Sequence, residues 1–251
     1  MSTVTIETRG AVRHVILDRP AKRNALDAAL IAALAEALRA AADDHQVRCV
    51  VLRGAGAVFS AGMDLAELAA LAEAPERLRE YRREILATWN LAEEMPKPTI
   101  AQLHGACIGG ALELALACDL RVMAEDAVAG LPETRVGLIP DLGGCSRLPA
   151  VVGLGRAKEM IMTGRMVGAE EALRSGLANR VAPAERLDEA TAALADELLA
   201  CSPLAVGLAK RALDAAAKPA LSTTLELELT AQQVCVGSLR PEEDANRPAQ
   251  T

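Results

Sequence analysis

Aromatic side chains are scarce in this sequence: among its 251 residues only Phe59, Tyr81 and Trp89 are aromatic. Proteins that bind single-stranded nucleic acids stack bases on aromatic rings and present basic surfaces. Here the formal net charge is −7. The composition therefore argues against a nucleic-acid partner, although a few local lysines or arginines would still suffice to hold an anionic small ligand.

Signals for membrane insertion and secretion are also lacking. No apolar run reaches the roughly 18 residues that a membrane-spanning helix needs. The start of the chain, Met1-Ser-Thr-Val-Thr-Ile-Glu7, does not show the basic segment and apolar segment of a signal peptide. We therefore expect a cytoplasmic protein with no membrane contact.

Metal and redox motifs are missing as well. The three histidines are not at ligand spacing, and the six cysteines are scattered without a C-x-x-C pair. His104 and Cys107 lie close in sequence, but nothing else supports a nucleophile pair, so both are interpreted as packing residues. We expect reduced core cysteines and no metal site.

Two common site motifs fail on inspection. Gly54-Ala-Gly-Ala-Val-Phe59 follows a strand-like run, but Phe59 occupies the position where a dinucleotide fingerprint requires a third glycine or alanine. No G-x-S-x-G motif is present, which removes the nucleophile elbow of the α/β-hydrolases.

Short strands alternate with helices up to about residue 183, which predicts an α/β core of repeated β-β-α units. The pattern predicts a hairpin over 4–18 that turns near Arg9-Gly10, strands over 49–53, 98–103 and 121–124, and helices over 27–42, 75–94, 156–163 and 169–175. A long loop is expected over 131–144. After residue 183, helical patterns over 184–200, 203–216 and 222–236 follow with no strand between them. We expect residues 1–183 to form the core and residues 184–251 a helical appendage, with a mobile tail from Arg240.

We expect the chain to be organised around the stretch that follows the strand over 98–103. Gly109 and Gly110 stand at the start of an apolar helical run that carries one carboxylate, Glu113. A helix start has free backbone N–H groups and the positive end of the helix dipole, and a carboxylate in apolar company is costly to bury unless it is used or paired. The stretch therefore suggests a site that stabilises an oxyanion and moves a proton.

Each feature also has a purely structural interpretation when it is taken alone. Gly109-Gly110 could be a packing contact, and Glu113 could pair with an arginine. Asp64 could cap a helix start, and Glu133 and Asp141, each directly after a proline, could be turn residues.

Taken together, five segments make the chain resemble the enoyl-CoA hydratase/isomerase family, also called the crotonase family. They occur in the order and spacing of that family and cover about residues 1–215. The segments are Arg19-Pro-Ala-Lys-Arg-Asn-Ala-Leu26, Phe59-Ser-Ala-Gly-Met-Asp-Leu65, Gly105-Ala-Cys-Ile-Gly-Gly-Ala-Leu-Glu-Leu-Ala-Leu-Ala-Cys-Asp119, Pro132-Glu-Thr-Arg-Val-Gly-Leu-Ile-Pro-Asp-Leu-Gly-Gly144 and Thr163-Gly-Arg-Met-Val-Gly-Ala-Glu-Glu-Ala172. The resemblance implies the crotonase-type (ClpP/crotonase) spiral of β-β-α units, with a C-terminal helical segment that builds homotrimers, often paired into hexamers.

The resemblance also implies the site. The backbone N–H groups of Met63 and Gly110 would form an oxyanion hole for the thioester carbonyl of an acyl-CoA substrate. Glu113 and Glu133 match the two catalytic acids of the hydratases in this family, with Glu133 supplying the proton to C2 and Glu113 orienting and deprotonating water. The positions where the family holds CoA and substrate correspond here to Lys22, Arg23, Ala25, Ala61, Gly62, Asp64, Leu65 and Gly109. Coenzyme A is then part of the substrate, and no separate cofactor is implied.

Two departures from the family pattern leave the reaction and the CoA contacts of the C-terminal region open. Asp141 lies where a plain hydratase commonly has a small residue and where the dienoyl-CoA isomerases of the family carry a carboxylate. No aromatic residue follows Trp89, whereas family members usually end in an aromatic-containing helix that helps a neighbouring subunit's CoA site. As a whole, the resemblance still implies first a 2-enoyl-CoA hydratase of fatty-acid β-oxidation. A dienoyl-CoA or enoyl-CoA isomerase that uses Glu113, Glu133 and Asp141 is the alternative, and a non-catalytic acyl-CoA-binding protein is the rival from another class.

Overall fold

The structure, a computed structural model, describes residues 3–238. The larger sheet has the spatial order β1-β2-β3-β4-β6-β9, and a smaller sheet has the order β5-β7-β8. The strands are β1 (Val4–Arg9), β2 (Val12–Leu17), β3 (Cys49–Gly54), β4 (Thr99–Leu103), β5 (Ala106–Ile108), β6 (Leu120–Ala124), β7 (Val128–Gly130), β8 (Met166–Gly168) and β9 (Arg180–Ala182). β1 and β2 form an antiparallel hairpin, and the other neighbours in the larger sheet run parallel.

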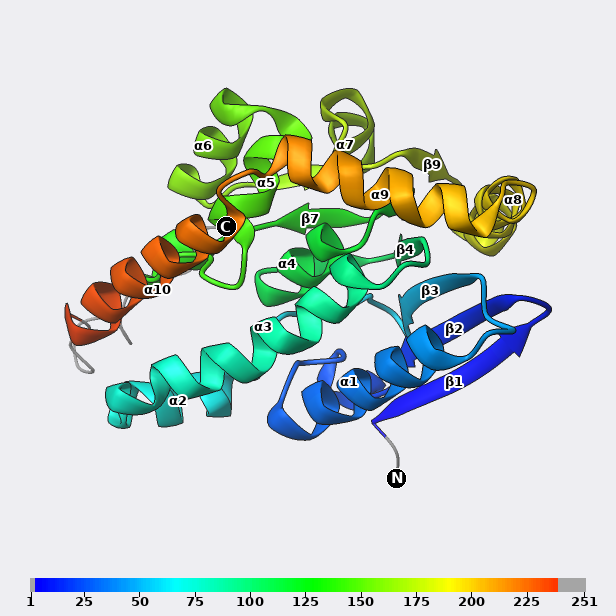
Figure 1. Cartoon of the computed structure of the whole chain (residues 1–251). Helices are drawn as coiled ribbons and strands as arrows, with labels where there is room; N and C mark the ends of the chain where they lie inside the picture. The colour runs from blue at the N-terminus through cyan, green and yellow to red at the C-terminus, as the bar shows by residue number, and fades with distance from the viewer. Residues whose placement is uncertain (1–2, 239–251) are drawn as a thin grey trace.

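Helices surround these sheets (Figure 1). The α-helices are α1 (Ala28–Asp43), α2 (Leu65–Glu73), α3 (Leu78–Glu94), α4 (Gly110–Ala117), α5 (Gly144–Val152), α6 (Leu154–Thr163), α7 (Ala169–Ser175), α8 (Leu187–Leu199), α9 (Pro203–Ala217) and α10 (Leu221–Ser238). Short 3₁₀-helices are η1 (Pro20–Lys22), η2 (Pro75–Arg77), η3 (Glu133–Val136) and η4 (Ala184–Arg186).

Local sequence explains the best-predicted elements. The side chain of Asp27 caps α1 by accepting a hydrogen bond from the Leu30 amide at 2.8 Å, and the Leu30, Leu34 and Leu38 side chains bury one stripe of that helix. Every residue of β4 is buried, as expected for a central parallel strand that is covered on both faces. The α/β class, the hairpin and helices α1, α6 and α7 are therefore confirmed.

Several elements differ from the prediction. The helix expected over 75–94 begins as the separate 3₁₀-turn η2, and α5 occupies residues expected to form no helix. The Gly143-Gly144 pair and Pro149 hide the helical pattern of α5, because glycine and proline both disfavour helix interiors. Strands β5, β7, β8 and β9 are three residues each, too short to show a period.

The C-terminal helices match the three predicted patterns and pack differently from one another. α8 packs against β3, β4, β6 and β9, so it shares the core of residues 1–183. α9 crosses the molecule from α8 to α10, and α10 packs against α3 and α5 (Figure 1). The tail predicted to be mobile from Arg240 lies outside the described residues.

No single helix within residues 3–238 has the length and apolar composition needed to cross a membrane. One bent pair, Ala184–Leu199 with Pro203–Ala217, meets that test only when its two parts are joined across a 103° bend.

Candidate active site

The loop before α2 and the start of α4 lie in contact. A β-carbon placed on Gly110 would lie 2.9 Å from Met63 Sδ, and the Ile108 amide donates to the Ser60 carbonyl at 3.3 Å. Within residues 3–238, neither the Met63 nor the Gly110 backbone N–H donates a hydrogen bond. The two amides predicted to form an oxyanion hole are therefore neighbours with free donors, and Gly110 is the first residue of a helix.

Glu113 is fully enclosed on α4, with 2% of its surface exposed. Its Oε1 accepts hydrogen bonds from the Leu142 amide at 2.7 Å and the Gly144 amide at 2.8 Å. The arginine pairing considered from the sequence is therefore wrong: the partners are two backbone amides. Burial, followed by the nearby carboxylates of Glu133 and Asp141, raises the pKa of Glu113 well above its ordinary value.

Glu133 is the first residue of η3, and its side chain lies next to Gly109, the residue before α4. A β-carbon on Gly109 would lie 2.9 Å from Glu133 Oε1. Its Oε2 is buried and has no hydrogen-bond partner in the described part of the chain. Burial raises the pKa of Glu133 to about 7, with a further contribution from Asp141. A carboxyl group with that pKa exchanges a proton readily near neutral pH.

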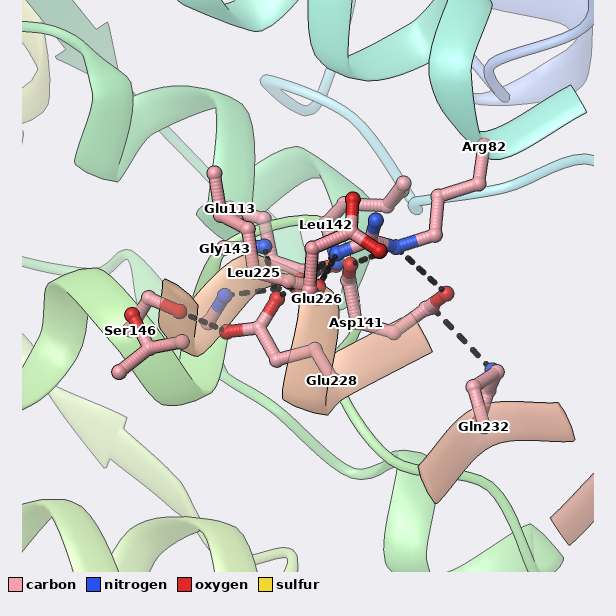
Figure 2. A network of polar contacts seen from close by, with 12 residues as sticks. Arg82, Glu113, Asp141, Leu142, Gly143, Ser146, Leu225, Glu226, Glu228 and Gln232 are labelled. Atoms are coloured by element: carbon pink, nitrogen blue, oxygen red, sulfur yellow. Dashed lines mark hydrogen bonds and ion pairs between the residues drawn. The ribbon is translucent and has the colours of Figure 1, made fainter. Parts of the chain in front are cut away.

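Asp141 is also buried, at 8% exposure, so it is not a solvated turn residue. Its Oδ1 accepts from Gln232 Nε2 at 3.2 Å, and its Oδ2 lies 3.3 Å from Arg82 Nε (Figure 2). Burial raises the pKa of Asp141 to about 7, although the Arg82 guanidinium acts in the opposite direction. The third acid considered from the sequence thus lies beside the other two.

A fourth carboxylate comes from α10 and was not singled out from the sequence. Glu228 is 4% exposed, accepts from the Gly143 amide at 2.9 Å and bonds to the Ser146 hydroxyl (Figure 2). The sequence around it, Leu225-Glu-Leu-Glu-Leu229, alternates with a period of two, which conceals its helical phase. The spacing of four between Glu228 and Gln232 is the one signal that places both on the same helix face.

The segments predicted to hold CoA and substrate are joined by backbone hydrogen bonds. The Ala61 amide donates to the Arg23 carbonyl at 2.9 Å, and the Leu26 amide donates to the Gly62 carbonyl at 2.8 Å. The side chains of Lys22, Arg23 and Leu65 are exposed beside this junction.

Two residues of this region already have structural partners. Asp64 caps α2 by accepting from the Ala66 amide, and it also pairs with Arg19 at 3.3 Å. The capping interpretation of Asp64 is thus confirmed. Ala25 offers its carbonyl oxygen to Arg19 Nη1 at 2.6 Å.

Buried Asn24 organises the loops on which these segments lie. Its Nδ2 donates to the carbonyls of Ala55, Val58 and Phe59, and its Oδ1 accepts from the Arg19 amide at 2.9 Å. Asn24 was not singled out from the sequence. Its left-handed backbone, with a φ of 54°, suits asparagine better than most residues.

The expectation of core cysteines holds for three of the six: Cys49, Cys107 and Cys118 are buried, whereas Cys145 and Cys235 are half-buried and Cys201 is exposed. Cys107 is 1% exposed and is confirmed as a packing residue, whereas His104 is half-buried with Nε2 3.1 Å from the Gly56 carbonyl oxygen. Within residues 3–238, no group of three or more His, Cys, Asp or Glu residues is arranged to hold a metal ion.

The chain is similar to proteins of known sequence and structure along almost its entire length. The model of the enoyl-CoA hydratase/isomerase family matches residues 7–242. A crystal structure of an enoyl-CoA hydratase/isomerase from Xanthobacter autotrophicus Py2 superposes with a TM-score of 0.86 at 36% identity, covering 97% of this chain and 91% of that one. The crotonase-type fold expected from the resemblance is thereby confirmed.

Relatives of both reaction types are present. A putative enoyl-CoA hydratase/isomerase of Bacillus subtilis is 41% identical over 221 residues, which span 87% of this chain and 84% of the relative. The mitochondrial Delta(3,5)-Delta(2,4)-dienoyl-CoA isomerase of Pongo abelii is also 41% identical, over 206 residues that span 78% of this chain and 63% of that protein. From the family match and these identities, the chain belongs to the enoyl-CoA hydratase/isomerase family.

Proposed function

We propose that the protein is an enoyl-CoA hydratase, which adds water across the C2=C3 bond of a 2-enoyl-CoA thioester. One observation carries the proposal: Glu113, which is buried, and Glu133, whose Oε2 is buried, have raised pKa values and lie beside the start of α4, where the Gly110 amide donates no hydrogen bond within the described residues. Like charges close together disfavour double ionisation, so the pair retains a proton near neutral pH. Hydration needs such a pair, in which one carboxyl group is protonated and acts as the acid while the other is ionised and acts as the base.

The reaction follows from these positions. The thioester oxygen accepts hydrogen bonds from the Met63 and Gly110 amides, which stabilise the negative charge that develops on it as water attacks C3. Glu113 takes the proton from that water and Glu133 gives its proton to C2, so the proton that the pair shares must be on Glu133 when the reaction begins. Proton exchange between the two carboxyl groups or with solvent then restores the starting state.

Purified protein mixed with crotonyl-CoA tests this proposal, because hydration removes the absorbance of the enoyl thioester. The variant Glu133→Gln should lose turnover by about 10²–10⁴-fold, the usual contribution of a general acid, while it still binds CoA. Wild-type protein that binds acyl-CoA but turns over no enoyl-CoA or dienoyl-CoA would instead identify a non-catalytic acyl-CoA-binding protein.

An isomerase is the second candidate, and Asp141 favours it. This third buried carboxyl group has a pKa of about 7 and an Oδ2 that accepts no hydrogen bond in the described residues. A third acid would move a proton along a longer conjugated chain, as a dienoyl-CoA isomerase requires. Asp141→Asn discriminates between the candidates: loss of dienoyl-CoA isomerisation with intact hydration would favour the isomerase.

The CoA contacts are part of the same proposal. Lys22 and Arg23 would meet the phosphates, and their exposure beside the substrate loop supports this role. The remaining contacts would come from Ala25, Ala61, Gly62, Asp64, Leu65 and Gly109. Replacing Lys22 with alanine should raise KM for an acyl-CoA and leave kcat nearly unchanged, since the lysine would contact the CoA phosphates and not the reacting atoms.

We also propose a homotrimer or a dimer of trimers. Leu204 and Leu208, four residues apart on one face of α9, are 73% and 55% exposed, an apolar surface that a second subunit would cover. The cytoplasmic compartment and a place in β-oxidation stay predictions, because relatives of this chain include a protein named as mitochondrial.

A further inference from the structure

We propose that Glu228 of α10 is a positioning residue for the acid pair: it fixes the turn whose amides hold Glu113. The turn comprises residues 141–144 and leads into α5, of which Gly144 is the first residue. The catalytic consequence of this inference rests on the proposed hydratase function, but the structural role of Glu228 can be tested without it.

Three successive amides of the turn bond to two carboxylates from different helices. The Leu142 and Gly144 amides donate to Glu113 on α4, and the Gly143 amide between them donates to Glu228 Oε2 on α10 at 2.9 Å. Gly143 has a φ of 102°, which directs its amide away from those of its neighbours. The turn is therefore clamped from two sides, and Glu113 keeps its acceptor geometry only while the turn holds its shape.

The rest of the environment shows that Glu228 is well anchored. The Ser146 hydroxyl at the start of α5 donates to Oε1, and Arg82 Nη2 of α3 lies 3.4 Å from Oε2 (Figure 2). Arg82 also donates to the backbone carbonyls of Asp141 and Leu225, at 2.6 Å each. A carboxylate buried to this extent is costly without such partners, so its contacts order the turn, α3 and α10 together.

The charge of Glu228 has a second effect. It raises the pKa of Glu113 and of Asp141, and Arg82 partly offsets the effect on Asp141. The charged and titratable groups that face Glu228 are Arg82 from α3, Asp141 from the turn, Glu113 from α4 and Cys145 from α5. Removal of the Glu228 charge should therefore shift the pH dependence of the reaction even if the turn stays in place.

Two variants separate these effects, with Glu226→Gln as the matched control. Glu226 lies two residues away on α10 and makes an exposed ion pair with Arg79. Glu228→Ala removes the acceptor and should speed hydrogen exchange of peptides that contain 142–144 by about tenfold, as expected for one lost charged hydrogen bond. It should lower kcat by a similar factor and leave KM within about twofold.

Glu228→Gln keeps an acceptor oxygen for the Gly143 amide but removes the charge. Hydrogen exchange of residues 142–144 should stay near the wild-type rate. The alkaline limb of the pH profile of kcat should move to lower pH, because the acid pair loses its proton more easily. A merely structural residue would not produce that shift.

The inference is overturned if Glu228→Ala exchanges at 142–144 like the control variant, or if Glu228→Gln leaves the pH profile unmoved. If Glu228→Ala unfolds generally, the Glu228→Gln profile decides. If the wild-type protein shows no turnover, the proposed function fails, and the exchange comparison of Glu228→Ala with the control still decides the clamp: the clamp is wrong if residues 142–144 exchange no faster in Glu228→Ala.

Discussion

Replacement of Glu113 by glutamine separates its chemical role from its structural role. The glutamine Oε1 can still accept from the Leu142 and Gly144 amides, which bond Glu113 at 2.7 and 2.8 Å, so the turn keeps both partners. The amide cannot take a proton from water. We therefore expect a properly folded protein whose hydration rate is lower by about 10²–10⁴-fold, the usual contribution of a general base.

Replacement by alanine gives the matching structural measurement. Glu113→Ala leaves two buried amides without an acceptor, and each such group costs about 1–3 kcal/mol. Its free energy of unfolding should be about 2–6 kcal/mol lower than that of Glu113→Gln, which is equally uncharged. For a chain of this length, about 1 kcal/mol moves Tm by about 2–4 °C, so the difference in Tm should be at least about 4 °C.

The effect of pH on stability has a definite sign. The pKa of Glu113 is raised in the folded protein above its ordinary value of 4.5, so the folded state binds its proton more tightly than the unfolded state. This contribution to stability is fully present below about pH 4.5 and is lost as pH rises through the folded pKa. Glu113→Gln does not titrate, so it should gain stability relative to wild type as pH rises from about 5 to about 8.

Thermal unfolding across that pH range, together with the crotonyl-CoA absorbance assay, measures all three effects. A Glu113→Gln variant that retains more than about a tenth of the wild-type rate would refute the proton-transfer role. A variant that loses stability relative to wild type as pH rises would refute the assigned direction of the pKa shift.

Three further predictions address the oxyanion hole, the loop anchor and the subunit surface. In Gly110→Ala the added methyl group would lie 2.9 Å from Met63 Sδ, so we expect kcat to fall by about 10²–10³-fold while circular dichroism stays unchanged. Asn24→Ala leaves buried carbonyls without their donor and should lower the urea-unfolding free energy by about 2–4 kcal/mol; an unchanged midpoint would contradict the anchoring role. Leu208→Lys changes a side chain that is 55% exposed, so the monomer should stay folded while sedimentation velocity shows a smaller species; an unaltered sedimentation coefficient would count against α9 as the interface.

The sequence predicted those elements whose ends are set locally. α1 and α7 fell within about one residue of their expected limits, because Asp27 caps the first and Gly176 ends the second in a left-handed conformation. α5 was not predicted because Gly143, Gly144 and Pro149 suppress its helical pattern, a cost that burial of Leu148 and the buried ion pair of Arg147 with Glu93 help to offset.

The candidate site divides in the same way. Gly110 and Glu113 lie on one helix turn, so their proximity follows from the sequence alone. Glu133 and Asp141 entered through the family resemblance, since nothing local shows that their loop returns to α4. The partners on α3 and α10, Arg82 and Glu228, depend on how distant helices pack, and their sequence neighbourhoods resemble ordinary solvated helices.

Arg82 places positive charge beside only part of the carboxylate cluster, which bears on the choice between hydration and isomerisation. Arg82 contacts Asp141 and Glu228, whereas Glu113 and Glu133 contact no arginine or lysine in the described part of the chain. The attraction of Arg82 favours the ionised form of Asp141, while the carboxylates around Glu113 oppose the ionisation of Glu113. Glu113 and Glu133 thus hold their proton without a cation beside them, as hydration requires, whereas Asp141, whose pKa is also raised to about 7, holds one against the attraction of Arg82.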